Sequence, residues 1–290
     1  SSYVAIVSPS HHHNWQHIKF KSCKEIPSNI IMHNQILKKL PQIEQTHQIK
    51  LLYVAESGSR AWGFASTDSD YDVRGIFIRP RNAYLSIDKP KETFEWIENN
   101  WFDVGAWDIT KALHLLRKSN AILFEWLQSP IVYQQYAGIQ KELFELAQLY
   151  YQPQIIVHHY RGIAKAVSRH HFEESHASKA IDEPIKLKKY FYLLRSLLAA
   201  YWTVKTENIP PMELNQLINI LTTDEQIIIR ELVSFKADKD EHFTWLPTDN
   251  MQKLITFLWQ ETATQLAKRT VPDSEILNNW FRKILDETDH

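Results

Sequence analysis

Two kinds of hydrophobic pattern follow one another along this chain, and the change between them falls near residue 134. Before that point, short apolar runs rich in β-branched and aromatic residues are bounded by Gly, Pro, Asn and Asp, which is typical of strands. A helical spacing of isoleucines and leucines begins after Pro27 and should end at Pro41, because proline breaks helices. The expected strands are residues 3–7, 49–55, 71–78, 92–97 and 101–107.

Beyond residue 134 the strand signals disappear and apolar residues recur at helical spacing, with prolines between the periodic stretches. We therefore predict an α+β fold. Residues 1–134 should form a small mixed β-sheet domain flanked by helices, and residues 135–290 an all-helical domain. The expected helices of the second half are 135–150, 154–170, 179–205, 212–221, 224–237, 250–269 and 274–286.

Composition narrows the class of protein. The chain has 290 residues, of which 44% are hydrophobic, enough to bury a substantial core. No apolar run reaches the roughly 18 residues of a membrane span, and residues 1–26 lack the apolar core of a signal peptide. We expect a cytoplasmic protein that does not enter a membrane. Its single cysteine, Cys23, excludes an intrachain disulfide and a cysteine-rich zinc site. The oligomeric state stays open.

The net charge of −1 argues against a surface that is basic throughout, so any nucleic acid must meet a local basic patch. Residues 160–205 are a candidate, with nine lysines and arginines against four acidic residues. The three consecutive histidines His11, His12 and His13 suggest a metal site at first sight. Side chains adjacent in a regular element point in different directions, so we interpret these histidines as a solvent-exposed loop.

The most informative stretch is residues 56–78. Gly58 and Ser59 end the strand at 49–55 with a sharp turn, and Asp70 and Asp72 open the strand at 71–78. In extended chain, residues two apart point to the same side. Two carboxylates held together repel each other unless a cation lies between them, and a divalent metal is the usual partner. The competing interpretation is a solvated turn, since aspartates are common in turns.

Spacing favours the metal interpretation. Gly-Ser-Arg-Ala-Trp-Gly-Phe at 58–64 is followed by Asp-Ser-Asp-Tyr-Asp-Val-Arg-Gly-Ile at 68–76, and Asp70 comes eleven residues after Ser59. These strings resemble the signature of the DNA polymerase beta-like nucleotidyltransferase superfamily, in particular the branch of predicted nucleotidyltransferases grouped with an RNA repair pathway. The resemblance implies that Gly58 and Ser59 hold the phosphates of a nucleotide and that the aspartates bind Mg²⁺.

A third carboxylate is needed, because the attacking hydroxyl must lose a proton while a metal bridges it to the phosphate. Asp103 is our candidate, since it is the only carboxylate within the expected strand at 101–107. Asp108 is the alternative, but its position favours the N-cap of a following helix. The family resemblance also points to Asp103, as an acidic strand residue eight before a helical lysine, here Lys111.

The helical half contains one further candidate. On a helix, Lys188, Tyr192 and Arg195 share a face, opposite an apolar face that should be core. By spacing alone this is equally an ordinary solvated basic face. The same family carries a Lys-x-x-x-Tyr-x-x-Arg helix after its catalytic domain, and the resemblance therefore implies nucleotide binding by these three residues, together with Arg60.

The predicted function is a metal-dependent nucleotidyltransferase. Two Mg²⁺ (or Mn²⁺) ions at Asp70, Asp72 and Asp103 would assist transfer of a nucleoside monophosphate from an NTP to an acceptor hydroxyl, with release of pyrophosphate. By family association the acceptor is an RNA 3′ end. A protein side chain or a small hydroxylated molecule is the second possibility, and a catalytically idle nucleotide-sensing protein is the third.

Overall fold

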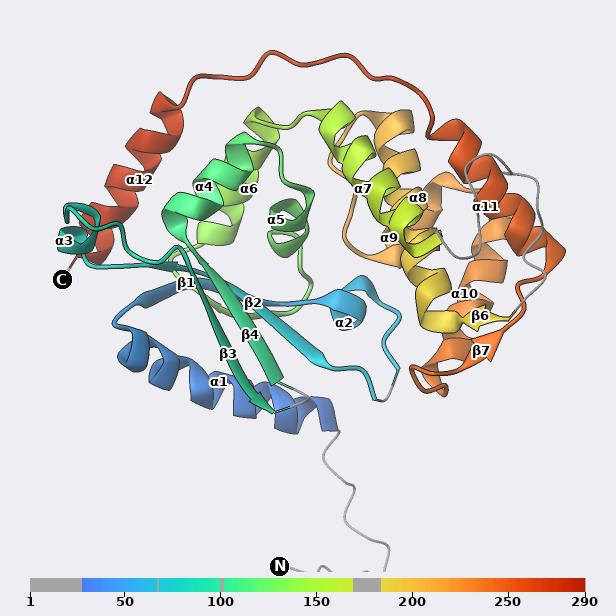
Figure 1. The fold of residues 1–290 in the computed structure, drawn as a ribbon, viewed down its shortest axis with the longest axis horizontal. Helices are drawn as coiled ribbons and strands as arrows, with labels where there is room; N and C mark the ends of the chain where they lie inside the picture. The colour runs from blue at the N-terminus through green and yellow to red at the C-terminus, as the bar shows by residue number, and fades with distance from the viewer. Residues whose placement is uncertain (1–27, 67, 100–101, 169–183, 290) are drawn as a thin grey trace, which may run out of the picture.

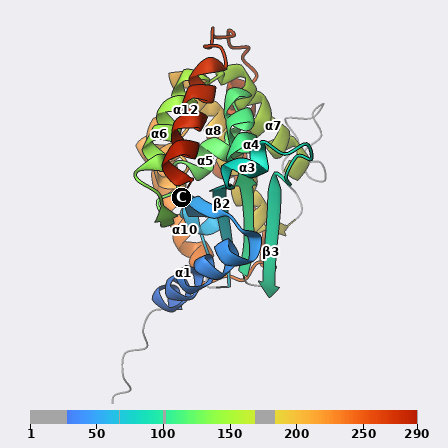
Figure 2. The same cartoon turned by 90° about the vertical axis from the view of Figure 1, so that its left-hand side faces the viewer.

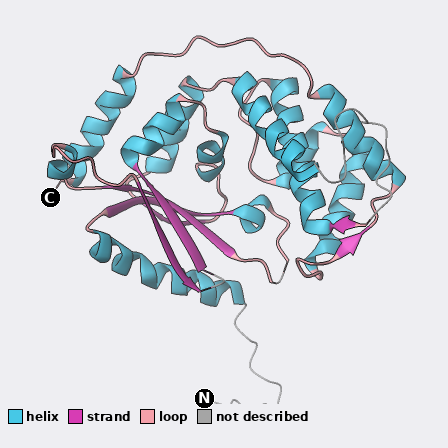
Figure 3. Ribbon diagram, viewed as in Figure 1, coloured by secondary structure: helices cyan, strands magenta, loops and turns pink. Residues whose placement is uncertain are grey.

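The computed structural model describes residues 28–66, 68–99, 102–168 and 184–289. Helices and strands alternate in its first part, which runs to the end of β5, and helices dominate the rest (Figures 1 and 3). The elements of the first part are α1 (Ser28–His47), β1 (Lys50–Ser57), α2 (Gly58–Trp62), β2 (Tyr71–Ile78), α3 (Arg81–Tyr84), β3 (Thr93–Asn99), β4 (Phe102–Asp108), α4 (Ile109–Arg117), α5 (Ala121–Trp126) and β5 (Val132–Gln135).

The second part begins with α6 and returns to the first part with α12, which packs against α4. Its elements are α6 (Ile139–Leu149), α7 (Pro153–Ser168), β6 (Ile185–Lys186), α8 (Leu187–Thr206), α9 (Leu214–Leu217), the 3₁₀ helix η2 (Ile218–Ile220), α10 (Thr223–Ala237), β7 (Thr244–Trp245), α11 (Asp249–Glu261) and α12 (Glu275–Thr288). Within the described residues, none of these helices combines the length and the apolar character that crossing a membrane requires.

The central sheet has five strands in the order β3-β4-β2-β1-β5. Its neighbouring strands pair antiparallel, apart from β2 and β4, which run parallel. A mixed sheet with helices on both sides, followed by a mainly helical part, confirms the predicted α+β class. It also places the C-terminal half of β1 and the N-terminal ends of β2 and β4 side by side, and these are the segments that carry the candidate site.

Each face of the sheet is covered by helices. On one face, Ile36, Leu40 and Ile43 of α1 are fully buried against Val73 and Val104. On the other face stand α4, α5 and α6, so that α1 and these helices lie on opposite sides of the strands (Figure 1). After a turn of 90°, α4, α6 and α12 are seen gathered at one end of the molecule and α1 at the other (Figure 2). Burial on both faces explains why the middle of β1, residues 51–55, is a continuous apolar run.

One hydrophobic core extends from the sheet into the helical part. It includes Leu52 of β1 and Leu194 of α8, and continues to Ile284 of α12. The chain crosses the molecule after α11, and α12 packs against α4 (Figure 1). Strand β5, which pairs with β1, spans residues 132–135 and so lies across the expected boundary. The division into domains at residue 134 stays a prediction.

Several predicted element bounds were wrong. Helix α1 continues through Pro41 to His47, because the burial of Leu40 and Ile43 on either side outweighs the backbone hydrogen bond that proline removes. Strands β5, β6 and β7 were not expected, being only two to four residues long. Helix α8 begins at Leu187, and α11 ends at Glu261 rather than 269. The expected strand at 3–7, His11–His13 and residues 179–183 lie outside the described residues.

Candidate active site

The turn after β1 packs directly against the carboxylate of Asp72. Gly58 has φ +64°, a left-handed conformation that L-residues disfavour, and it starts the five-residue helix α2. A Cβ atom built on Gly58 would lie 2.2 Å from Asp72 Oδ2, far inside van der Waals contact. Only glycine therefore allows the Gly58–Ser59 turn and Asp72 to approach each other this closely.

Gly58→Ala is expected to destabilise the protein by about 1–2 kcal/mol through its positive φ, and to move the Asp72 carboxylate. Gly138→Ala is the matched control, because Gly138 has φ +76° but nothing within 4 Å of its built Cβ. Chemical denaturation should show similar losses for both variants, whereas nucleotidyl transfer should fall only in Gly58→Ala. Equal activity in the two variants would remove the link between this close approach and function.

Strand pairing brings two of the predicted carboxylates together. The parallel β2–β4 register sets Asp72 opposite Asp103. Their neighbours Val73 and Val104 are buried beneath α1, so both aspartates point to the opposite face of the sheet. Asp70 lies two residues before Asp72 on the exposed approach to β2, and its charge acts on that of Asp72. The expected convergence is thus seen for Asp72 and Asp103, with Asp70 beside them.

Arg74 joins the two facing carboxylates. Its Nη2 lies 3.0 Å from Asp103 Oδ2 and 3.4 Å from Asp72 Oδ1. The pKa of Asp72 is raised, first by burial; the charge of Arg74 lowers it, while Asp103 and Asp70 raise it again. Two carboxylates, Asp103 and Asp70, and two cations, Arg74 and Lys188, thus act on Asp72, and burial keeps its pKa raised.

The donor set suits a divalent cation, although the side chains are not gathered as a metal site. Within the described ranges, no group of three or more His, Cys, Asp or Glu residues is close enough together to hold an ion. Carboxylate oxygens are the ligands that Mg²⁺ and Mn²⁺ prefer. As the side chains stand, the Arg74 guanidinium supplies the positive charge between Asp72 and Asp103. The three aspartates thus fit the ion in charge and in donor type.

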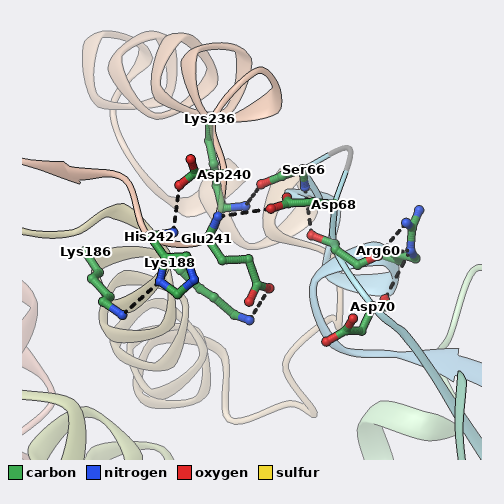
Figure 4. Close-up of polar contacts among 11 residues, drawn as sticks. Arg60, Ser66, Asp68, Asp70, Lys186, Lys188, Lys236, Asp240, Glu241 and His242 are labelled. Atoms are coloured by element: carbon green, nitrogen blue, oxygen red, sulfur yellow. Dashed lines mark hydrogen bonds and ion pairs between the residues drawn. The ribbon is translucent and has the colours of Figure 1, made fainter. Parts of the chain in front are cut away.

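Arg60 fastens the loop that presents Asp70. Its guanidinium donates to the backbone carbonyls of Ser69 (2.6 Å) and Asp70 (3.2 Å), and lies 3.8 Å above the ring centre of Tyr71. The loop is closed on itself, because the Ser66 amide donates to Ser69 Oγ at 2.9 Å. Figure 4 shows Arg60 beside Asp70 at the end of this loop. The predicted contact of Arg60 with phosphate stays a prediction.

Helix α8 brings Lys188 and Tyr192 within electrostatic reach of the aspartates. Burial alone would lower the pKa of Lys188, but its hydrogen bond to Glu241 and the charge of Asp70 raise it above the usual value. Tyr192 is half-buried and packs edge-to-face on Trp62 of α2 at 5.1 Å. Burial raises the pKa of Tyr192, and the nearby charge of Asp72 raises it further.

Arg195, the third predicted residue of α8, is buried and fully engaged. Its Nη1 donates to Glu125 Oε1 at 2.8 Å, and its Nε and Nη2 both donate to the Met212 carbonyl. The guanidinium also lies 4.5 Å from the ring centre of Trp62. In this arrangement Arg195 contacts α2 through Trp62, and a direct contact between Arg195 and a nucleotide stays a prediction.

Glu125 is the centre of that buried network. It accepts hydrogen bonds from Trp62 Nε1 (3.1 Å) and Tyr160 Oη (2.6 Å) in addition to Arg195. The network thus joins α2, which follows the Gly58 turn, to α5, α7 and α8. Sequence reasoning did not give Glu125 this role, since its partners are 35 to 70 residues away along the chain.

Two further residues of the site were missed. Arg74 had a visible signal, because it lies two residues after Asp72 in a strand and so shares its face. Glu56 is a single acidic residue at the end of an apolar run, with 1% of its surface exposed. It accepts from the Asp72 amide at 2.8 Å and from Tyr133 Oη at 2.6 Å. Burial raises the pKa of Glu56 to about 7.

Glu56→Gln is expected to change how stability depends on pH. Because the folded state binds the proton more tightly than the unfolded state, Glu56 favours folding at low pH and loses this contribution between about pH 4.5 and 7. The shift corresponds to about 3 kcal/mol. Urea unfolding with a chelator present should show wild type losing roughly this much relative to Glu56→Gln from pH 4.5 to 8. Parallel pH profiles for the two proteins would exclude this account.

Asp108 is the N-cap of α4, the alternative to a catalytic role that its position in the sequence favoured. It is 1% exposed, caps α4 by accepting from the Thr110 amide at 2.9 Å, and accepts a further hydrogen bond from Tyr84 Oη at 2.9 Å. The prediction of an N-cap at Asp108 is confirmed. Asp103 is left as the acidic residue of β4 that faces Asp72, and its catalytic role stays a prediction.

A comparison with known protein families identifies the family of this chain. The model of the RNA repair pathway DNA polymerase beta family matches residues 32–283. The chain belongs to this family. By family it is a polymerase beta-like nucleotidyltransferase, a class of enzymes that generally uses divalent metals. The family match includes both the sheet and nearly all of the helical part, down to α12.

The similar protein that was found has no characterised function of its own. The chain is 37% identical over 196 residues to YcgL of Bacillus subtilis (strain 168), which is described as an uncharacterized protein. The similarity covers 68% of this chain and 72% of YcgL.

Proposed function

We propose that this chain is a metal-dependent nucleotidyltransferase that transfers a nucleoside monophosphate from an NTP to an acceptor hydroxyl. The observation that carries the proposal is the pairing of Asp72 with Asp103 in the β2–β4 register, directly against the Gly58 turn. Family membership supports the reaction class. Asp70, Asp72 and Asp103 are the proposed ligands of two Mg²⁺ or Mn²⁺ ions, which when bound neutralise phosphate charge and acidify the attacking hydroxyl.

The residues of the chain have distinct tasks in the proposed reaction. The Gly58 and Ser59 amides and the Ser59 hydroxyl hold the outer phosphates, as backbone groups at a tight turn commonly do. Asp103, which is partly exposed, accepts the proton of the acceptor hydroxyl. The hydroxyl oxygen then bonds to the α-phosphorus, the bond from that phosphorus to its bridging oxygen breaks, and pyrophosphate leaves.

Positive charge for the triphosphate is available from Lys188 and Arg60, with Tyr192 beside them. The proposed role of Lys188 is supported by its electrostatic interaction with Asp70 and Asp72. Arg60 is supported by its bonds to the loop that ends at Asp70. For Arg195 we propose a supporting role first, since its donors are taken by Glu125 and Met212.

For the acceptor we propose an RNA 3′ end, on the ground of the family's association with RNA repair. One observation favours the second candidate, a protein side chain or a small hydroxylated molecule. The basic surplus at 160–205 is partly compensated, because Lys188, Arg195 and Lys205 form ion pairs with Glu241, Glu125 and Glu261. Less of that charge is left for a nucleic acid than the sequence indicates.

The test is to incubate the protein with each α-labelled NTP, Mg²⁺ or Mn²⁺, and total RNA, and to follow the label. Label that enters RNA and is released as a 3′-terminal nucleotide supports the first candidate. Label on the protein or on a small molecule supports the second. Transfer to RNA should also weaken steeply with added salt, whereas transfer to a small acceptor should not. If no NTP is consumed with any acceptor or metal, the proposed function is wrong.

A further inference from the structure

A polar cluster lies where the helical part meets the loop that leads to Asp70. We call it the Lys188–Glu241 cluster; its members are Lys188, Lys236, Glu241, Ser66 and Asp68. Lys188 of α8 forms an ion pair with Glu241, which follows α10. The Glu241 amide donates to Asp68 Oδ2 at 3.3 Å, so the same residue also contacts the loop. Figure 4 shows these side chains between α8, α10 and the loop, with Asp70 nearby.

Lys236 is the least expected member of the cluster. Only 4% of its surface is exposed, and its Nζ donates to the neutral hydroxyl of Ser66 at 2.6 Å. Among the residues that the structure describes, no carboxylate lies within ion-pair distance of Lys236. Burial lowers its pKa, and the charge of Lys188 lowers it further. The charges of Asp68 and Glu241 raise its pKa from beyond ion-pair distance. Burying a positive charge without a close anion is unfavourable, so an anion that came closer would stabilise the charge of Lys236.

The cluster adjoins the proposed metal site. The charges of Asp70 and Asp72 both act on Lys188. Lys188 is therefore within electrostatic reach of those aspartates while its ammonium group is paired with Glu241. A triphosphate whose α-phosphate lies at the aspartates and whose outer phosphates are held at the Gly58 turn would also present its outermost phosphate to Lys188. The ammonium group of Lys188 is now paired with the carboxylate of Glu241.

We propose that Glu241 acts as an internal anion on the phosphate-binding Lys188 of the proposed function, and that it holds this place until the outermost phosphate of a nucleotide displaces it. This inference rests on the proposed function for the identity of its ligand. The incoming phosphate replaces the Glu241 carboxylate on Lys188, and the buried charge of Lys236 supports it from behind Ser66. A terminal phosphate carries more negative charge than one carboxylate and accepts more hydrogen bonds, so it can displace Glu241. A monophosphate bound at the aspartates has no second or third phosphate to reach Lys188, so the exchange favours triphosphates.

Glu241 thereby sets the affinity for the polyphosphate tail. Because Glu241 and Lys188 are each about one-third exposed, the competing ion pair is weak enough to exchange. Removing the carboxylate should tighten binding of a polyphosphate by about threefold to tenfold. An increase in affinity on mutation is informative, since damage to the fold would weaken binding instead.

The test measures the binding of inorganic tripolyphosphate and of a nucleoside monophosphate by calorimetry, with Mg²⁺ present, to wild type, Glu241→Gln and Lys236→Met. Glu261→Gln is the matched control, because Glu261 pairs with Lys205 at the far end of the same helix α8. Asp240→Asn controls for the loss of a negative charge near Lys188. Asp240 is next to Glu241 in the chain, but it is exposed and accepts a hydrogen bond from the His242 amide.

Tripolyphosphate should bind several-fold more tightly to Glu241→Gln and more weakly to Lys236→Met, with both controls like wild type. Monophosphate binding should be unchanged in all variants. Equal tripolyphosphate affinity in wild type and Glu241→Gln, equal tightening in Asp240→Asn, or no binding to any variant would overturn the inference. These outcomes are separate from the proposed function, because tripolyphosphate has no nucleotide to transfer. A chain that binds tripolyphosphate as expected but transfers no nucleotide would refute the proposed function alone.

Discussion

Asp72→Asn should abolish nucleotidyl transfer while the protein stays folded. The substitution keeps the volume of the side chain and an oxygen that can accept a hydrogen bond from Arg74. It removes the negative charge of Asp72, which acts together with those of Asp70 and Asp103. Metal ions contribute several kcal/mol to such a transition state, and about 4 kcal/mol corresponds to a thousandfold. We expect a loss of at least about a thousandfold in kcat, measured with labelled NTP once the acceptor is identified.

The stability of Asp72→Asn near neutral pH should equal or exceed that of wild type. Burial first, and then repulsion from Asp103 and Asp70, raise the pKa of Asp72, so its ionised form is less favourable in the folded state. Asp88→Asn is a suitable control, since Asp88 is exposed in the bend after α3, which follows the C-terminal end of β2, whereas Asp72 lies near the N-terminal end of that strand. It should leave activity unchanged. Turnover by Asp72→Asn at the wild-type rate would show that this carboxylate has no part in the reaction.

Arg195→Met should cause the largest loss of stability. It removes the guanidinium and leaves Glu125 buried, with Trp62 and Tyr160 as its only hydrogen-bond donors among the described residues. Breaking a buried ion pair in this way typically costs about 3–5 kcal/mol. Chemical denaturation should therefore show a midpoint far below that of wild type. The double variant Arg195→Met with Glu125→Gln should recover much of the loss, because no charge is then left without its partner.

Lys205→Met is the matched control for Arg195→Met, since Lys205 also lies on α8 and pairs with a glutamate, but at the surface. Its unfolding midpoint should stay close to wild type. If Arg195→Met were as stable as Lys205→Met, the buried network would not hold α2 against the helical part. The supporting role proposed for Arg195 would then be wrong.

Local sequence signals were sufficient for the strand–turn–strand unit. The apolar run of β1, the glycine at position 58 and the alternation of β2 gave these elements nearly to the residue, because each signal lies within a few positions. Asp103 was chosen on similar grounds. Its placement opposite Asp72 depends on the parallel pairing of β2 with β4, which skips β3, and no local pattern indicates that register.

The rest of the site is made by contacts between distant parts of the chain. Arg195 and Lys188 looked alike in sequence, as basic residues on one face of a helix. Their surroundings differ because their partners come from opposite directions along the chain: Glu125 precedes α8 and pairs with Arg195, whereas Glu241 follows α8 and pairs with Lys188. Lys236 showed no signal, since a lysine in an amphipathic helix is ordinarily solvated. The predicted end of the helix at Pro41 was wrong although the local signal was clear, because burial of α1 against the sheet outweighs the local effect of the proline.

The most direct test of the account is to measure Mn²⁺ binding by electron paramagnetic resonance, in wild type and in Asp72→Asn and Asp103→Asn. If the facing carboxylates of β2 and β4 are metal ligands, wild type should take up Mn²⁺ and each variant should bind it at least tenfold more weakly. Asp88→Asn should bind as wild type does. Equal Mn²⁺ affinity in all four proteins, or no uptake by wild type, would contradict the assignment of Asp72 and Asp103 as the metal-binding centre of this enzyme.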